Sequence, residues 1–200
     1  MLKIENLTVK FGERTVIESL SLTLPKSGIY TLSGPSGCGK TTLLHVICGA
    51  LAPSAGSITH SFEKISASFQ EPRLIPWLDL EQNIKFVLSK GENSSFSIDE
   101  ILEALDLNEK KNAHPNTLSG GMQQRAALAR AILHGGDLLL LDEPFSAQDE
   151  ATKARVIALV KRVNKNGLTL IVTHDDTDAA SLGATPLTCH GTPLCEIKEG

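Results

Sequence analysis

The stretch that decides the fold is Gly34-Pro35-Ser36-Gly37-Cys38-Gly39-Lys40-Thr41, which satisfies the pattern G-x-x-x-x-G-K-[ST]. It lies between a predicted strand and a predicted helix, Gly28–Leu32 and Lys40–Leu51. Glycines let successive backbone N–H groups converge on phosphate, and the start of the helix adds partial positive charge. We expect Lys40 to reach β- and γ-phosphates, Thr41 to offer Mg²⁺ a hydroxyl, and Thr42 to lie beside them. The alternative is a glycine-rich turn with a solvated lysine.

Two adjacent carboxylates follow the all-apolar segment Leu138–Leu141, which is predicted to be a strand buried on both faces. Asp142 and Glu143 would emerge at the carboxyl end of that strand, where open α/β sheets bind ligands. Because side chains alternate along an extended chain, the two should point different ways. Asp142 can then join a Mg²⁺ shell while Glu143 polarises water at the γ-phosphate. The alternative is a pair of solvated acids ending a strand.

The order of the remaining predicted elements places the chain in the α/β class. Alternating apolar residues within Leu2–Leu24 predict an N-terminal antiparallel β layer, and Ser57–His60 and Ile65–Phe69 are short predicted strands. A helical insert is expected over about residues 71–135, including a helix over Met122–Leu133. Leu168–Val172 then supplies a second buried strand, so buried strands alternate with helices and a parallel sheet follows. We expect one domain over residues 1–200.

Composition sets broad limits on function. The 200 residues are 41% hydrophobic and 21% charged, which is typical of a soluble globular chain. The formal net charge of −4 argues against broad nonspecific binding to nucleic acid. The longest apolar run, Val156–Val160, is far shorter than a membrane span, and no signal peptide is evident, so the cytosol is the expected compartment. The cysteines, which form no C-x-x-C pair, are expected to remain thiols; they are Cys38, Cys48, Cys189 and Cys195.

Several segments together resemble the ATP-binding cassette (ABC) ATPases. Leu118-Ser119-Gly120-Gly121-Met122-Gln123-Gln124-Arg125 is similar to the signature sequence of that family, although Met122 replaces its usual glutamine. Further similar segments are Phe69-Gln70-Glu71-Pro72 for the Q-loop, Ser146-Ala147-Gln148-Asp149 for the D-loop and Thr173-His174-Asp175 for the switch histidine. The resemblance runs from about Leu2 to about Leu182. It implies a P-loop NTPase core with the antiparallel layer and an inserted helical subdomain.

The same resemblance implies a site that one chain cannot complete. In this family two cassettes face each other head to tail, so a homodimer or paired cassette would enclose each ATP and its Mg²⁺. Ser119, Gly120 and Gly121 would face the partner's γ-phosphate, the alternative being an ordinary helix N-cap and turn. His174 would hydrogen-bond the γ-phosphate and Gln70 would join the Mg²⁺ and water shell. Phe11 would stack on adenine, or else only cap the β layer.

Finer similarities point to one branch of the family. Gln70–Leu78 followed by Asn83, together with Met122, is similar to importer ATPases for nitrate, sulfonate and taurine. Such an ATPase would work on the cytoplasmic face of the membrane with integral permease subunits and an extracytoplasmic substrate-binding protein, and without nucleic acid. Leu74–Leu80 would dock the permease, although Trp77 could equally be subdomain core. An exporter or extrusion ATPase and a non-transport ABC ATPase remain the alternatives.

Overall fold

The computed structural model describes residues 1–88, 96–146, 148–163, 166–175 and 177–200. Its N-terminal part is a three-stranded antiparallel sheet in the order β2-β1-β4, made of β1 (Leu2–Phe11), β2 (Arg14–Leu24) and β4 (Ala55–His60). The alternation that predicted this layer is visible in β1, where Leu2, Ile4, Leu7 and Val9 are buried. The antiparallel layer is therefore confirmed, and the predicted strand at Ser57–His60 is its third member.

The second sheet has six strands in the order β5-β6-β7-β3-β8-β9. Its first five strands are parallel, and β9 closes the edge by pairing antiparallel with β8. The bounds are β3 (Gly28–Ser33), β5 (Ile65–Ser68), β6 (Leu138–Asp142), β7 (Leu168–Val172), β8 (Thr185–His190) and β9 (Glu196–Glu199). The predicted parallel sheet is confirmed. β8 and β9 were not predicted, because threonine and proline interrupt the apolar pattern in β8 and three of the four residues of β9 are charged.

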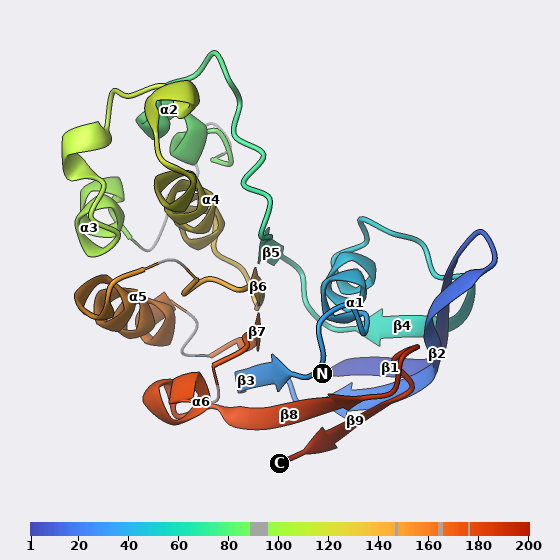
Figure 1. Ribbon diagram of the computed structural model, residues 1–200. Helices are drawn as coiled ribbons and strands as arrows, with labels where there is room; N and C mark the ends of the chain where they lie inside the picture. The colour runs from blue at the N-terminus through green and yellow to red at the C-terminus, as the bar shows by residue number, and fades with distance from the viewer. Residues whose placement is uncertain (89–95, 147, 164–165, 176) are drawn as a thin grey trace.

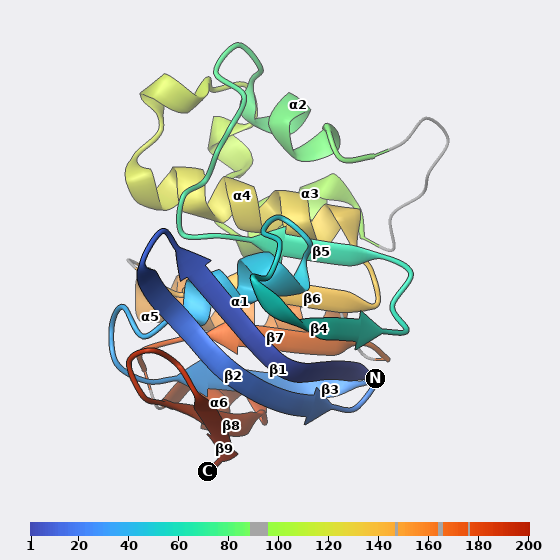
Figure 2. The ribbon, with the colours of Figure 1, turned by 90° about the vertical axis from the view of Figure 1, so that its right-hand side faces the viewer.

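Alternate side chains of the central strands enter two different cores. Leu138 and Leu140 of β6 pack in the core that also contains the antiparallel layer and helix α1 (Lys40–Ile47). Leu139 and Leu141 pack in a second core, which contains residues of α4 (Gly120–His134) and α5 (Glu150–Val163). Both faces of the sheet are thus covered, which explains why β6 and β7 read as uninterrupted buried segments. Figure 2 shows the antiparallel layer lying over α1.

Helix α1 is shorter than predicted. It ends at Ile47 instead of Leu51, because Cys48 closes the helix and Gly49 follows with a φ of 77°. A positive φ is inexpensive only for glycine and stops the helical path.

The predicted helical insert lies between β5 and β6. It contains α2 (Leu80–Lys85), α3 (Ile98–Ala104), two 3₁₀ turns (Asn108–Lys110 and Pro115–Thr117) and α4. Asp79 with Gln82 and Ser97 with Glu100 form the two capping boxes expected from their spacing. Figure 1 shows α2, α3 and α4 grouped at one end of the molecule, away from the antiparallel layer. A short helix α6 (Thr177–Leu182) precedes β8.

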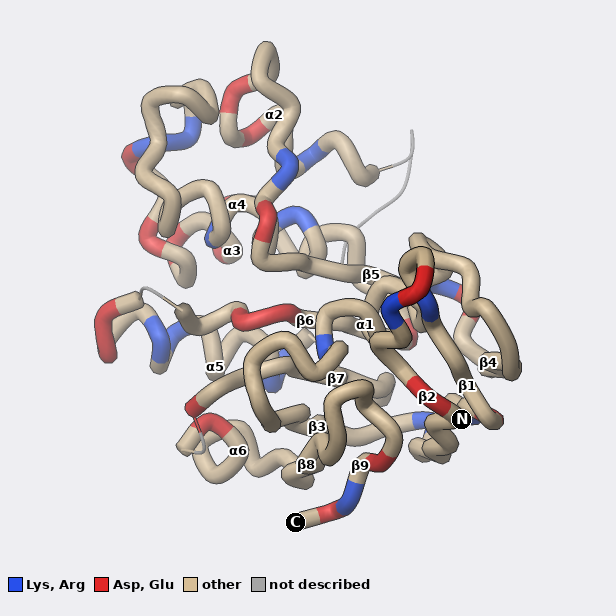
Figure 3. Tube along the Cα trace, turned by 45° about the vertical axis from the view of Figure 1, so that its right-hand side comes forward, with Lys and Arg blue, Asp and Glu red and all other residues tan. Residues whose placement is uncertain are grey.

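The distribution of charged and apolar residues in the described part of the chain is that of an ordinary folded protein. Lys and Arg segments are interspersed with Asp and Glu segments along the trace (Figure 3). Within the described ranges, no helix has the length and apolarity needed to cross a membrane.

The cysteines give a direct test of this packing. Cys38 and Cys189 are buried, Cys195 is exposed, and all four thiols are free. Burial, assisted by the neighbouring Cys38, raises the pKa of Cys189 to about 12. Because the thiolate is the reactive form, iodoacetamide at pH 8 should modify Cys195 readily and leave Cys38 and Cys189 intact until denaturant is added. Mass spectrometry of the alkylated peptides measures this order, and early labelling of Cys189 would contradict the packing of β8 against the glycine-rich loop.

Candidate functional site

The glycine-rich loop connects the end of β3 to the start of α1, as predicted. Gly34 has a φ of 142° and Gly39, the residue before the helix, a φ of 121°. A Cβ atom on Gly34 would lie 2.8 Å from the Cβ of Cys189, and one on Gly39 would lie 3.1 Å from the Val16 carbonyl oxygen. Both the backbone conformation and the close neighbours therefore require glycine at these two positions.

Lys40 is almost fully buried at the start of α1, with 6% of its surface exposed. Its ammonium group donates hydrogen bonds to the carbonyl oxygens of Gly34 (2.8 Å) and Pro35 (2.9 Å). The loop is thereby folded around the ammonium group of Lys40. Lys40 is therefore not the solvated lysine of the alternative interpretation.

A cavity of about 550 Å³ opens in front of this loop. The residues that line it come from β1, β2, the loop, α1 and the ends of β6 and β7. Ten of its lining residues were predicted from sequence, namely Phe11, Ser36, Gly37, Gly39, Lys40, Thr41, Thr42, Gln70, Glu143 and His174. Arg14, Val16 and Val172 were missed. Arg14 begins β2 just across the hairpin turn from Phe11, so the predicted hairpin itself was the available signal.

Phe11 lies at the end of β1 with 53% of its surface exposed, facing the cavity. An aromatic ring this exposed contributes little to the β layer, so the capping alternative explains it poorly. The ring is available as a flat apolar surface for a planar base.

Asp142 and Thr41 meet at the junction of β6 and α1. The Thr41 hydroxyl donates a hydrogen bond of 2.7 Å to Oδ2 of Asp142. Burial raises the pKa of Asp142, and the hydrogen bond from Thr41 opposes that rise. A hydroxyl and a carboxylate oxygen in contact are a donor set suited to Mg²⁺, which usually takes only one or two protein ligands beside phosphate and water. The residues present therefore fit the metal.

Glu143 lies in a turn directly after β6, and not in the extended strand that the sequence prediction assumed. β6 ends at Asp142, and Glu143 has a φ of 52°, a left-handed conformation that costs energy for a residue with a side chain. Its backbone N–H still donates to the Val172 carbonyl oxygen (2.9 Å), which fixes this turn against β7. The two carboxylates therefore have different partners, Thr41 for Asp142 and His174 for Glu143.

The Glu143 carboxylate lies against His174, which follows β7. Nε2 of His174 is 2.8 Å from Oε1 of Glu143. The His174 side chain is 46% exposed and that of Glu143 is 23% exposed, so both reach solvent at the cavity. Such an arrangement can orient a water molecule and take a proton from it.

Gln70 lies at the edge of the cavity and is exposed. Its backbone carbonyl accepts a hydrogen bond from Gln124 of α4 (3.3 Å). Arg130, also on α4, donates to the carbonyl oxygens of Pro72 (2.8 Å) and Arg73 (3.2 Å). The segment after β5 is therefore tied to the helical subdomain.

The predicted signature residues lie elsewhere. Ser119 is the N-cap of α4, and its side-chain oxygen accepts from the Met122 N–H (3.3 Å). Ser119 and Gly120 are exposed, and Ser119, Gly120 and Gly121 are not among the described residues that line the cavity. Gly34, Pro35 and Cys38 do not line it either, Cys38 being buried in the core. In the predicted D-loop, Ala147 lies outside the described residues.

A glycine-rich loop between β3 and α1, with carboxylates at the end of the neighbouring parallel strand, defines a P-loop nucleoside triphosphatase. The sequence pattern of the ABC transporter family matches residues 17–146. The chain belongs to that family, and it is an ATP-binding, ATP-hydrolysing subunit of an ABC transporter.

Individual relatives support this assignment. The aliphatic sulfonates import ATP-binding protein SsuB 2 of Pseudomonas syringae pv. tomato is 39% identical over 185 residues, 92% of this chain and 79% of that protein. The Fe(3+) ions import ATP-binding protein FbpC of Fusobacterium nucleatum is 36% identical over 90% of this chain and 53% of that protein. A dimeric post-hydrolysis structure of the ATP-binding cassette MJ0796 with ADP and Pi is 27% identical, covers 100% of this chain and 98% of that one, and has a TM-score of 0.83.

Lys40 provides the sharpest test of the cavity. Replacing it in Lys40→Ala should weaken ATP binding by roughly 10- to 100-fold, because a hydrogen bond to a charged group contributes about 1.5–3 kcal/mol. Isothermal titration calorimetry measures the change. Lys161→Ala, on the exposed face of α5, is the matched control and should bind ATP like the parent. Unchanged binding by Lys40→Ala would remove the loop from the nucleotide site.

Proposed function

We propose that two copies of this chain enclose two ATP molecules at composite sites and drive a separate membrane permease. The observation that carries this proposal is a division within one chain. The cavity at the P-loop holds Lys40, Glu143 and His174, whereas the exposed start of α4 at Ser119–Gly121 lies outside that cavity. The dimeric ATP-binding cassette among the similar structures supports completion of the site by a second copy.

Within each site, the residues of this chain divide the work. Backbone amides of Ser36–Thr42 and the Lys40 ammonium hold the phosphates, and Phe11 stacks on the base. Thr41, Asp142 and Gln70 are the residues that would hold Mg²⁺, which shields phosphate charge when bound. From the other copy, the first N–H groups of α4 face the γ-phosphate, where an anion satisfies them.

Hydrolysis is assigned to the pair of Glu143 and His174. Glu143 accepts a proton from the attacking water, and the 2.8 Å contact with His174 fixes the direction of its carboxylate. His174 is exposed enough to reach a phosphate oxygen as well. ATP binding would close the dimer and hydrolysis would reopen it.

The relatives' names favour import of a small organic anion of the sulfonate type, with the chain on the cytoplasmic face of the membrane. Nitrate, an inorganic anion, and taurine, a sulfonate that also carries an ammonium group, remain candidates. Permease subunits and an extracytoplasmic substrate-binding protein are then the partners, and the cargo contacts them. An FbpC-like importer is a second candidate, because the similarity to that relative is nearly as high.

Leu74–Leu80 is the proposed docking surface for the permease. Trp77 is 77% exposed, so it is not part of the subdomain core. The alternative prediction, which placed Trp77 in that core, is therefore wrong. The segment is nevertheless fixed. Asn83, fully buried on α2, accepts from the Ile75 N–H (2.7 Å) and donates to the carbonyl oxygens of Ile75, Leu78 and Asp79. A fixed, exposed tryptophan is typical of an interface anchor.

The composite site predicts a dimer that depends on nucleotide. Glu143→Gln should bind ATP with Mg²⁺ but hydrolyse it about 10²- to 10⁴-fold more slowly, because general-base assistance is removed. The closed dimer should therefore accumulate, as light scattering after size exclusion would measure.

A second substitution, Ser119→Arg, is the control, since it places a bulky cation at the start of α4 and should return Glu143→Gln to a monomer. If Glu143→Gln stays monomeric at high concentration with ATP and Mg²⁺, the composite-site model is wrong.

The docking surface predicts a loss of coupling. Trp77→Ala should leave the basal ATPase of the isolated chain unchanged, because the side chain does not line the ATP cavity. It should weaken assembly with the permease by at least about tenfold, the size expected for an interface tryptophan. Co-purification of the permease and transport in vesicles measure this effect, and Phe86→Ala, which removes an exposed aromatic ring from the end of α2, is the comparison. Equal transport by Trp77→Ala would place the interface elsewhere.

A further inference from the structure

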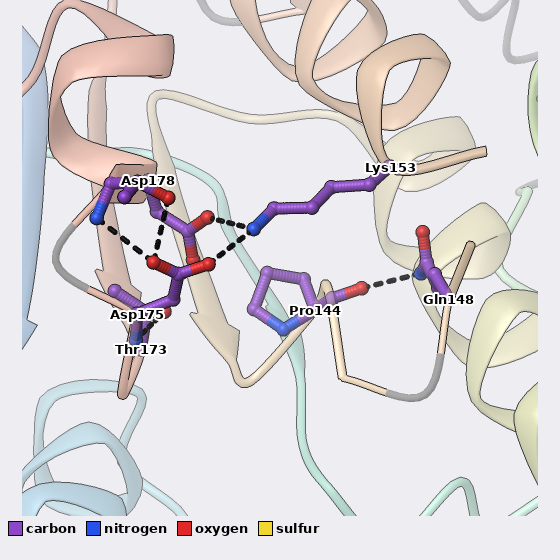
Figure 4. A network of polar contacts seen from close by, with 7 residues as sticks. Pro144, Gln148, Lys153, Thr173, Asp175 and Asp178 are labelled. Atoms are coloured by element: carbon purple, nitrogen blue, oxygen red, sulfur yellow. Dashed lines mark hydrogen bonds and ion pairs between the residues drawn. The ribbon is translucent and has the colours of Figure 1, made fainter. Parts of the chain in front are cut away.

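A partly buried ionic network joins Lys153, Asp175 and Asp178 (Figure 4), and these residues line a small cavity together with Glu143 and His174. Lys153, in the first turn of α5, places its ammonium 2.6 Å from Oδ2 of Asp175 and 2.7 Å from Oδ1 of Asp178. The Lys153 side chain is 14% exposed and that of Asp178 only 1% exposed. Hydrogen bonding to the two carboxylates raises the pKa of Lys153, and its ammonium lowers the pKa of Asp175. Lys153 and Asp175 are therefore both charged at neutral pH.

Each carboxylate also fixes a different part of the turn that contains His174. Thr173, just before the histidine, donates its hydroxyl to Oδ2 of Asp178. The N–H of Asp175, just after it, donates to the Thr173 hydroxyl (3.1 Å). Oδ1 of Asp175 accepts from the N–H (2.9 Å) and hydroxyl (2.6 Å) of Thr177. The backbone on both sides of His174 is thus held by groups that Lys153 joins.

The segment that precedes α5 leads back to Glu143. The Ser146 hydroxyl donates to the Glu143 carbonyl oxygen (2.9 Å), and the Gln148 side chain donates to that of Pro144 (2.7 Å). At the start of α5, Oδ1 of Asp149 accepts from the Thr152 N–H (2.9 Å), one residue before Lys153. A cavity of about 140 Å³ is lined by Glu143, His174 and the network residues together. The network therefore borders the Glu143–His174 contact directly.

Charge explains why Lys153 is the critical member. One ammonium faces two carboxylates, and Asp178 has almost no access to water. Loss of the ammonium would leave a buried carboxylate unpaired beside a second one, which strongly favours rearrangement of the turn. On an ordinary helix surface a lysine would be solvated and dispensable.

We propose that Lys153 is a positioning residue for ATP hydrolysis. From α5 it holds Asp175 and Asp178, which fix Thr173, so that His174 remains in contact with Glu143. This inference rests on the hydrolytic roles proposed for those two residues. Lys153 touches neither the P-loop nor the cavity in front of it, so it should influence the chemical step without influencing ATP binding.

The kinetic test compares Lys153→Met, which keeps the length of the side chain but removes its charge, with Lys153→Arg, which keeps the charge. We expect Lys153→Met to lower kcat at least about tenfold with KM for ATP changed less than about twofold. Lys153→Arg should recover most of kcat. Equal kcat values for Lys153→Met and the parent would overturn the proposal, as would a loss confined to KM.

A spectroscopic readout separates positioning from general destabilisation. In ¹⁵N-histidine-labelled protein, the His174 signal is assigned with His174→Gln and should show Nε2 carrying the proton donated to Glu143. Lys153→Met should shift this signal toward that of a free histidine, whereas Lys153→Arg should not. His45, which stacks on Phe69 at a ring distance of 4.1 Å, is the internal control for folding. A fall in kcat with an unmoved His174 signal would overturn the proposal.

Asp175→Asn is the milder variant if Lys153→Met does not fold, since Asp175 is 46% exposed and one of the two ion pairs survives. It should give an intermediate fall in kcat and a smaller shift of His174, and no effect on either would count against the network. Failure of the proposed function can be told apart from failure of the proposed role of Lys153. Full ATPase activity in His174→Gln would remove the hydrolytic role of His174, while the histidine shift in Lys153→Met would still report the structural connection.

Discussion

The hydrogen-bonded register of three adjacent parallel strands is the constraint on which the site depends. In the order β6-β7-β3, Asp142 pairs with Val172 and Val172 pairs with Leu32. The first residues beyond these strands are consequently neighbours, and they are Glu143, the segment containing His174, and the glycine-rich loop. A slip of one strand by one residue would also turn its buried side chains to the opposite core. Burial of alternate side chains in two separate cores therefore holds the strands in the register that forms the site.

Features of the site that depend on sequence neighbours could be predicted from the sequence. Features that depend on contacts between distant residues could not. The glycine-rich loop and the acidic pair were readable because each depends on neighbours in sequence, and the buried strand before Asp142 showed which end of the sheet to expect. The left-handed turn at Glu143 was not readable, since it depends on a hydrogen bond to Val172. Lys153 was missed because a lysine in the first turn of a helix normally faces water, and Asp175 and Asp178 are distant in sequence.

The helical subdomain contributes to the same site through its backbone contacts. Gln124 and Arg130 of α4 bond to carbonyl oxygens of Gln70, Pro72 and Arg73, immediately before the proposed docking segment. The exposed Ser119 begins the same helix. A rigid shift of α4 would thus displace both the edge of the cavity at Gln70 and the proposed docking segment. This is a mechanical connection between elements in contact, and it requires no longer pathway.

Electrostatics explains why a charged network, and not an apolar one, suits the region behind Glu143. A buried ion pair is weak as a source of stability, because desolvation offsets most of its attraction. It is directional, however, and the ion pair with Lys153 together with the hydrogen bond from Thr173 fixes the position of Asp178 more narrowly than apolar packing would. The proposed hydrolytic pair, Glu143 and His174, is a contact of 2.8 Å between two partly exposed side chains, so a fixed position of these side chains matters more here than a gain in folding free energy. The same reasoning applies to Lys40, whose contacts with Gly34 and Pro35 hold a charge in place where phosphate must arrive.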